Sequence, residues 1–209
     1  MGANDFDFGK LDFSDMVFDE VAHAYFLNGK HLPSVTQLLK LVTAGMFDNI
    51  PEEVLEHKRQ IGVAVHKACE LLDMDDLDEG SLSPSLIPFV DAYKLFKAQN
   101  KVEILLNEQK MCHKTLAYAG TVDRVAIINN EPKKTIIDLK TSASLSDWVG
   151  LQLAGYSMAL GSHTGEQYKR CALQLRPDGT YRYHEYNDPM DLPVFQSLLN
   201  VHNWMLNHK

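Results

Sequence analysis

The sequence has few cysteines and no long run of apolar residues. Its three cysteines, Cys69, Cys112 and Cys171, are odd in number and widely spaced, which argues against a secreted disulfide framework. We interpret them as small buried apolar side chains. No stretch approaches the roughly 18 apolar residues of a membrane-spanning helix, so no membrane partner is expected. The first residues lack a basic segment followed by an apolar one, so we expect no signal peptide and a cytoplasmic location.

The sequence also has fewer basic than acidic residues. The 209 residues include 20 Lys and Arg against 28 Asp and Glu, and the net charge is −8. This balance disfavours a protein that holds nucleic acid by bulk charge alone. It is compatible with a site where carboxylates gather around a divalent cation, because the cation reverses the local field. The length and the 45% hydrophobic content suit one folded domain rather than a disordered chain.

The N-terminal half reads as a hairpin followed by helices. The first 15 residues alternate Phe with Asp and Gly without a period, and we interpret them as a loose arm before a single domain over 16–209. The pair Asn28-Gly29 predicts a β-hairpin turn, and Ser34 is placed to cap a short helix that ends near Thr43. Helical periodicity then predicts two longer helices, over residues 51–73 and 85–100.

The C-terminal half begins with a period typical of strands. Three strands are predicted over residues 102–112, 116–128 and 134–142. A helix capped by Asp147 and ended by Gly161 follows, then two strands joined by the turn Pro177-Asp178-Gly179, and a final helix over 189–208. Helices and strands that do not strictly alternate favour an α/β or α+β fold. We therefore expect a central mixed sheet flanked by helices, preceded by the hairpin and a helical extension.

The hairpin between the second and third of these strands carries the residues of chemical interest. Asp123 lies about as far before the turn near Asn130 as Asp138 lies after it, so the two aspartates should face each other. Lys140 lies two residues beyond Asp138 and therefore on the same face. Two carboxylates this close repel unless a cation lies between them, and oxygen ligands suit Mg²⁺ or Mn²⁺. A lysine beside such a cation can orient water or neutralise a phosphoryl oxygen, which suits phosphodiester hydrolysis.

Two interpretations without a catalytic site are also possible for the charged residues. An exposed sheet face with ordinary salt bridges would also place acids and lysine together, but the neighbours Ile136, Ile137 and Leu139 are apolar and disfavour a solvated face. Basic residues further upstream could form a strip for phosphate contacts, or simply a solvated face. These residues are Lys94, Lys97, Lys101, Lys110, His113 and Lys114.

Taken together, the motifs resemble the PD-(D/E)XK nuclease superfamily, and within it the RecB-type exonucleases encoded by phages. The resemblance covers residues 17–186 and rests on Gly120-Thr121-Val122-Asp123, Asp138-Leu139-Lys140-Thr141, Gln152-Leu153-Ala154-Gly155-Tyr156, and the upstream Gly62, His66 and Glu70. It implies a restriction-endonuclease-like core and a metal-dependent DNA exonuclease of phage or bacterial recombination, repair or processing. The alternatives are a structure-specific endonuclease on the same core and a nucleic-acid-binding module without catalysis.

The resemblance also implies roles for the residues of the hairpin and the upstream helix. His66, Asp123, Asp138 and the backbone carbonyl of Leu139 would bind Mg²⁺ or Mn²⁺. Lys140 would position the attacking water. The second acid is Asp138 where many members of the superfamily carry Glu, which is an allowed variant. All three charged residues of the motif are present, which argues against the module without catalysis.

Further residues would complete the site. Gln152 and Tyr156 lie four residues apart and share a helix face, so they would hold Lys140 or contact the DNA backbone, with Thr141 as another DNA contact. Glu108 and Glu70 are additional acidic candidates. The chain lacks the four cysteines of some RecB-type members, so no iron–sulfur cluster is expected. The resemblance implies DNA as a partner, together with a single-strand annealing protein, and is compatible with a monomer or an oligomer.

Overall fold

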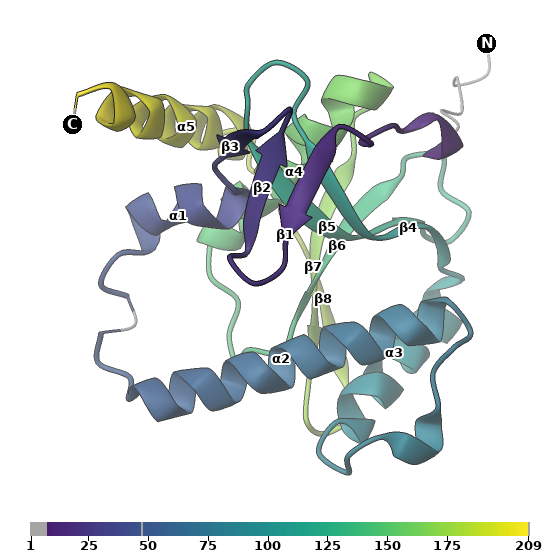
Figure 1. Ribbon diagram of the computed structural model, residues 1–209. Helices are drawn as coiled ribbons and strands as arrows, with labels where there is room; N and C mark the ends of the chain where they lie inside the picture. Colours follow the sequence, from purple (N-terminus) through teal and green to yellow (C-terminus); the bar gives the residue numbers. More distant parts are fainter. Residues whose placement is uncertain (1–7, 47, 209) are drawn as a thin grey trace.

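A five-stranded mixed sheet forms the centre of the molecule (Figure 1). The structure is a computed structural model and describes residues 8–46 and 48–208. The strand order along the sheet is β4 (Glu103–Cys112), β5 (Ala119–Ile127), β6 (Thr135–Lys140), β7 (Lys169–Leu175) and β8 (Tyr181–Glu185). Only β6 and β7 run parallel, and α4 (Trp148–Thr164) makes the crossover that a parallel pair requires. The predicted central mixed sheet is thus confirmed.

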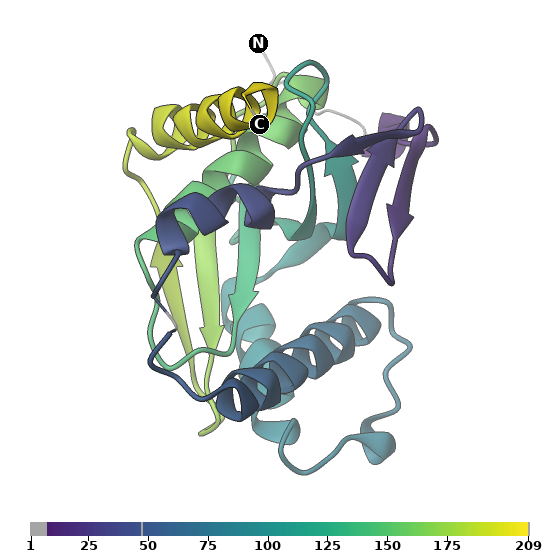
Figure 2. The same ribbon diagram turned by 60° about the vertical axis from the view of Figure 1, so that its left-hand side comes forward.

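Helices cover both faces of this sheet (Figure 2). α1 (Val35–Thr43), α4 and α5 (Asp191–Asn207) pack on one face, whereas α2 (Glu52–Asp73) and α3 (Ile87–Asn100) pack on the other. The neighbours Ile136 and Ile137 of β6 belong to opposite cores, because successive side chains of a strand point to opposite faces. Burial on both sides explains why β6 is apolar apart from its charged end, and confirms the flanking helices.

A small antiparallel sheet precedes these layers. Its strands are β1 (Met16–Asp19), β2 (Ala24–Leu27) and β3 (Lys30–Leu32). The predicted turn at Asn28-Gly29 joins β2 to β3, with φ of 49° and 76° at its two residues, a conformation that glycine and asparagine tolerate. Tyr25 and Leu32 pack against Cys112 and Ala119 at the edge of the large sheet. The hairpin is confirmed, and β1 extends it to three strands.

The N-terminal arm is packed where the structure describes it. Residues 1–7 lie outside the described part of the chain. A short 3₁₀ turn (Phe8–Lys10) follows, and Phe8, Leu11 and Phe13 pack against the core under α1, α4 and α5. From Phe8 to Phe13 the arm is therefore docked rather than loose, because its apolar side chains find a buried surface.

Local signals account for the helix ends, with one correction. Ser34 caps α1 as predicted: its Oγ accepts from the backbone N–H of Gln37 at 3.1 Å, and the Gln37 side chain accepts from the backbone N–H of Ser34 at 3.0 Å. The predicted end of α4 at Gly161 is wrong. The helix continues to Thr164 and ends at Gly165, whose φ of 73° suits a helix C-cap. The side chain of Asp147 makes no capping hydrogen bond.

The cysteines and the remaining connection between helices complete the fold. The three cysteines are buried free thiols, as predicted. Cys69 and Cys171 lie in the core under α2 and α3, and Cys112 lies beneath the small sheet. A second 3₁₀ turn (Glu79–Ser81) connects α2 to α3. Within the described residues, no helix is both long and apolar enough to cross a membrane.

Candidate metal centre and active site

The strand register brings the two aspartates together at the end of the β5–β6 ladder. Arg124 pairs with Ile137 and Val125 with Ile136, and continuing this register sets Asp123 opposite Asp138. Oδ2 of Asp123 then accepts a hydrogen bond of 2.7 Å from the backbone N–H of Leu139. Asp123 is 7% exposed and Asp138 is 1% exposed, so both carboxylates are held away from bulk water. The printed register and the contact of Asp123 with Leu139 agree with the predicted pairing of these residues.

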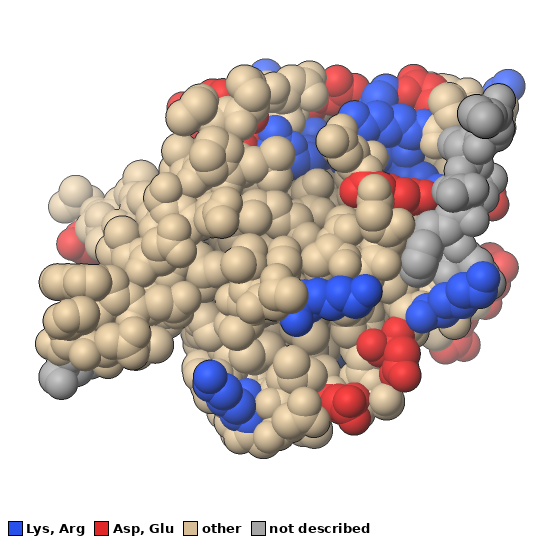
Figure 3. Space-filling view, turned by 90° about the horizontal axis from the view of Figure 1, so that it is seen from above, with Lys and Arg blue, Asp and Glu red and all other residues tan. Residues whose placement is uncertain are grey.

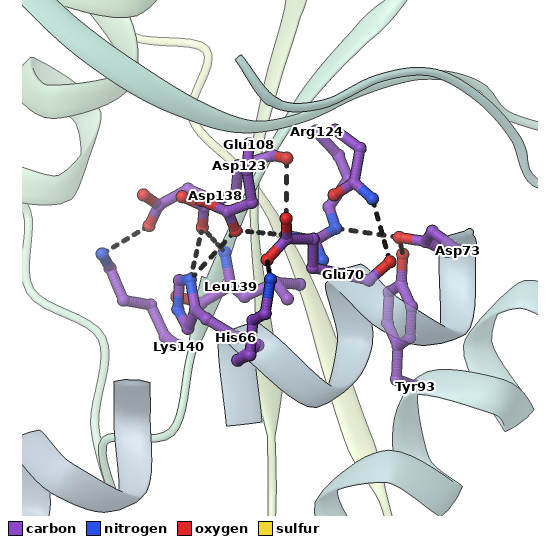
Figure 4. Close-up of polar contacts among 12 residues, drawn as sticks. His66, Glu70, Asp73, Tyr93, Glu108, Asp123, Arg124, Asp138, Leu139 and Lys140 are labelled. Atoms are coloured by element: carbon purple, nitrogen blue, oxygen red, sulfur yellow. Dashed lines mark hydrogen bonds and ion pairs between the residues drawn. The ribbon is translucent and has the colours of Figure 1, made fainter. Parts of the chain in front are cut away.

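Three possible metal ligands converge beside this pair (Figure 4). His66 comes from α2, Glu108 from β4 and Asp123 from β5, and one ligand atom of each lies within 4.8 Å of the other two. Nδ1 of His66 is 3.6 Å from Oε1 of Glu108 and 3.5 Å from Oδ2 of Asp123. We call these three residues the ligand trio. An imidazole nitrogen and carboxylate oxygens are groups that can hold a divalent cation.

The orientation of the His66 ring is set by the backbone of β6. Nε2 of His66 donates to the carbonyl oxygen of Leu139 at 3.1 Å. A ring N–H held by a carbonyl fixes the tautomer of the neutral ring. The lone pair of Nδ1 then faces Glu108 and Asp123, the other two members of the ligand trio. The sequence predicts the Leu139 carbonyl as a metal ligand; in the structure this carbonyl accepts from His66 and orients its ring.

The carboxylates around His66 govern its protonation. Burial alone lowers the pKa of His66, but the negative charges of Asp123, Glu108 and Asp138 outweigh it and the net shift raises that pKa. A proton on Nδ1 lies between the same carboxylates that would bind a cation. Cation binding must therefore displace this proton, as it does at other histidine ligands.

Asp138 lies next to the trio and pairs with Lys140. Its Oδ2 is 2.5 Å from Nζ of Lys140, and this oxygen is buried without a well-formed hydrogen bond. Burial raises the pKa of Asp138 to about 6; Lys140 opposes the shift and Asp123 adds to it. The Lys140 ammonium therefore already offsets the charge of this buried carboxylate, which lies next to the trio without being one of its three members.

Helix α4 supplies polar side chains that lead to Lys140. Nζ of Lys140 donates to Oε1 of Gln152 at 3.1 Å, and Nε2 of Gln152 donates to the Tyr156 hydroxyl at 3.0 Å. Both side chains are buried against the sheet. Gly120 makes room for them, because a Cβ at this position would lie only 2.9 Å from the Tyr156 ring. Of the two expected roles, this geometry favours holding Lys140 over contacting DNA.

Two other predicted residues lie outside the trio. The Glu70 carboxylate pairs with Lys67 of the same helix at 2.8 Å, and only its backbone carbonyl contacts β4, where it accepts from Asn107. Thr141 follows β6 directly, and a Cβ on Gly62 would lie 3.5 Å from its hydroxyl oxygen. Thr141 thus lies where α2 passes the strand end.

A buried ion network that sequence reasoning missed lies behind Glu108. Arg124 is 0% exposed and donates to Glu108 at 2.8 Å through Nη1 and to Asp73 at 3.1 Å through Nε (Figure 4). Asp73, at the end of α2, also accepts from Tyr93 at 2.7 Å and from Lys97 at 2.6 Å. Arg124 thereby joins α2 to the strand that carries Glu108.

The backbone at Glu108 is itself unusual. Its φ is 46°, a left-handed conformation that costs a non-glycine residue roughly 1–2 kcal/mol. Ladder pairs lie on either side of Glu108, at Asn107–Arg124 and Gln109–Val122. Such conformations persist where the surroundings hold them, often at functional sites. The Arg124 contact is one such restraint on Glu108.

The basic residues that the sequence offers as a strip for phosphate contacts are partly engaged in contacts within the protein. Lys94 pairs with Glu79 at 2.5 Å, and Lys97 pairs with Asp73. Lys110 lies over the ring of Phe18, with Nζ 5.1 Å from the ring centre. These lysines therefore have structural partners.

Comparisons with known proteins do not place the chain in a family. No family model and no curated protein matches it. Among solved structures, the chain is similar to one titled "Crystal structure of SSO0001", with 21% sequence identity and a TM-score of 0.35. The match covers 56% of this chain and spans 59% of the length of that protein.

Replacing Asp138 by Asn should stabilise the metal-free protein near pH 7.5. The pKa of Asp138 is about 6 in the folded state, against an ordinary value of 3.8. Above about pH 6 the buried carboxylate is ionised, and this buried charge destabilises the folded state. The expected gain is roughly 1–3 kcal/mol, since one pKa unit corresponds to about 1.4 kcal/mol. Below about pH 3 the carboxyl is neutral in both states and the gain should vanish.

Urea unfolding in EDTA at both pH values measures this difference. Between pH 3.8 and about 6, Asp138 holds a proton more often in the folded state than in the unfolded state. The free energy of unfolding of the wild type therefore falls relative to that of the Asn variant as pH rises. An Asp138→Asn variant less stable than wild type near pH 7.5 would mean that the Lys140 ion pair outweighs burial.

Proposed function

We propose that the protein is a divalent-metal-dependent deoxyribonuclease of the PD-(D/E)XK type, with a restriction-endonuclease-like core. One observation carries this proposal: Lys140 lies within 2.5 Å of Asp138, is held by Gln152, and stands beside the ligand trio. A buried acid pair, an imidazole and a fixed ammonium group at one strand end are the parts that metal-assisted phosphodiester hydrolysis needs.

Each residue has a defined part in the proposed reaction. A divalent cation held by the trio, with Asp138 adjacent, would polarise the phosphodiester and acidify a water. Lys140 orients the attacking water and offsets negative charge that develops on the phosphoryl oxygens. Gln152 keeps the Lys140 ammonium in place, and Tyr156 holds Gln152. Attack in line with the leaving 3′-oxygen would yield a 5′-phosphate.

The biological setting of this proposal follows the resemblance in the sequence. We propose an exonuclease in phage or bacterial DNA recombination, repair or processing, acting with a single-strand annealing protein. A structure-specific endonuclease would use the same groups, and a binding module without catalysis would retain only the DNA contacts. The following test separates these three functions.

Linear end-labelled DNA and closed circular DNA should be incubated with Mg²⁺, Mn²⁺ or EDTA. We expect degradation of the linear DNA with either metal, none in EDTA, and an intact circle. The reason is that only ends present a strand terminus to an exonuclease, while both metals suit the oxygen-rich site. Cutting of the circle would indicate the endonuclease, and binding without cleavage of either substrate would overturn the proposed catalysis.

A further inference from the structure

Two hollows open on either side of Lys140. One, of about 600 Å³, lies between α1 and α4 and is lined by Lys40. The other, of about 880 Å³, lies between α2 and the β7–β8 turn and is lined by Arg59 and Arg176. Lys140 and Trp148 line both, so the hollows adjoin at the lysine of the proposed active site. We call them together the Trp148 groove.

The Trp148 groove is positive on a negative molecule. It is lined by five of the chain's 20 Lys and Arg but by one of its 28 acids, Asp178. The five are Lys40, Lys58, Arg59, Lys140 and Arg176. Arg59 pairs with Glu52 and Glu56, whereas Lys40 and Lys58 form no ion pair with another described residue. On the face seen from above, Lys and Arg lie beside Asp and Glu over one half, and the rest is mostly uncharged (Figure 3). A polyanion is therefore favoured in the groove.

The walls of the groove are apolar. The larger hollow is lined by Leu55, Ile61, Phe89, Trp148, Leu175 and Pro177. Apolar and aromatic walls between cations suit a chain of phosphates whose flat bases are uncovered. In a duplex the base faces are stacked and paired, so they cannot reach such walls without unpairing.

Trp148 lies where the two hollows meet. Its indole Nε1 is buried and has no hydrogen-bond partner among the described residues. Because Nε1 itself is covered, the half-buried ring is the part of Trp148 that faces a bound strand. The same ring offers a surface on which a base can stack.

We infer that the Trp148 groove binds an unpaired DNA strand and leads its phosphates to Lys140. This inference rests on the proposed function and narrows the substrate to single-stranded ends. Basic residues at the rim hold the backbone, and the apolar walls take the bases without reading their sequence. Blunt duplex ends enter only after the terminal pairs open.

The test measures binding apart from cleavage. In the Trp204→Phe protein Trp148 is the only tryptophan, since the chain has two; Trp204 is 61% exposed on α5 and belongs to no part of the site. A mixed-sequence single strand, and the same sequence as blunt duplex, are titrated in EDTA and again with Ca²⁺. We expect the single strand to quench Trp148 fluorescence and to bind about tenfold more tightly than duplex.

Matched variants locate the bound strand. Anisotropy of a labelled single strand should show about tenfold weaker binding for Lys58→Ala combined with Arg176→Ala, and a smaller loss for Trp148→Phe. Lys133→Ala, which lines a different hollow beside α4, should bind like wild type. Equal or tighter duplex binding, or groove variants that match Lys133→Ala, would overturn the inference even if the protein cleaves DNA. Selective single-strand binding without cleavage would overturn the nuclease and leave the groove assigned.

Discussion

Lys140→Ala should slow metal-dependent DNA cleavage by roughly 10²–10⁴-fold, the range for loss of a group that positions a proton or stabilises charge. The ammonium group lies 2.5 Å from Asp138, and Gln152 fixes it there. Removing it leaves the ligand trio in place but takes away the positive charge beside the attacking water. Single-turnover cleavage of end-labelled linear DNA at saturating Mg²⁺ measures the chemical step without product release.

Two controls make this result specific to Lys140. Lys133→Ala removes a lysine that lies in another hollow, and its rate should equal that of wild type. Circular dichroism should show that Lys140→Ala remains folded, because the side chain is at the end of β6 and partly exposed. A folded Lys140→Ala protein with the wild-type rate would exclude the proposed catalytic role.

Arg124→Met should destabilise the protein by about 3–5 kcal/mol, as expected when one partner is removed from a buried ion network. The Arg124 side chain is fully buried between Asp73 and Glu108, and Met fills most of its volume without replacing its charge. Such a loss is a large share of the roughly 5–15 kcal/mol that stabilises a typical domain. Urea unfolding monitored by circular dichroism gives this free energy.

Arg59→Met is the matched control for Arg124→Met. Arg59 also contacts two acids, Glu52 and Glu56, but its side chain is 62% exposed, so its loss should cost less than about 1 kcal/mol. A second readout separates positioning from stability. Arg124→Met should weaken Mn²⁺ binding, followed by titration calorimetry, by about 10–100-fold, and Arg124→Lys should restore part of it. Unchanged Mn²⁺ affinity would mean that Arg124 supports only the fold.

Features coded by neighbouring residues could be predicted from the sequence. The Asn28-Gly29 turn, the Ser34 cap and the β5–β6 register depend on short-range geometry. The turn and the cap are confirmed, and the register agrees with the predicted Asp123–Asp138 pairing. His66 was identified by resemblance, and the structure places it in the trio. The end of α4 was misjudged because Gly161 and Gly165 carry the same local signal. Only packing distinguishes them.

Features that depend on distant residues could not be predicted with the same security. Glu108 joins the trio because β4 pairs with β5 and holds Glu108 in a left-handed conformation, which a single Glu in a strand pattern does not reveal. Arg124 and Asp73 are 51 residues apart and meet only when α2 packs on the sheet. The lining of the Trp148 groove comes from helices α1 to α4, the end of β6 with the connection that follows it, and β7 with the turn after it, so no motif marks it.

The ligand trio has a consequence for the way the chain holds together. His66, Glu108 and Asp123 belong to α2, β4 and β5, so a cation shared by them would tie α2 to the paired strands β4 and β5. Such a tie acts as a reversible cross-link that closes long loops of the chain. With the proposed cation bound, the docking of α2 on the sheet would be linked to the concentration of free metal, and the protein would be most rigid where the cation is abundant.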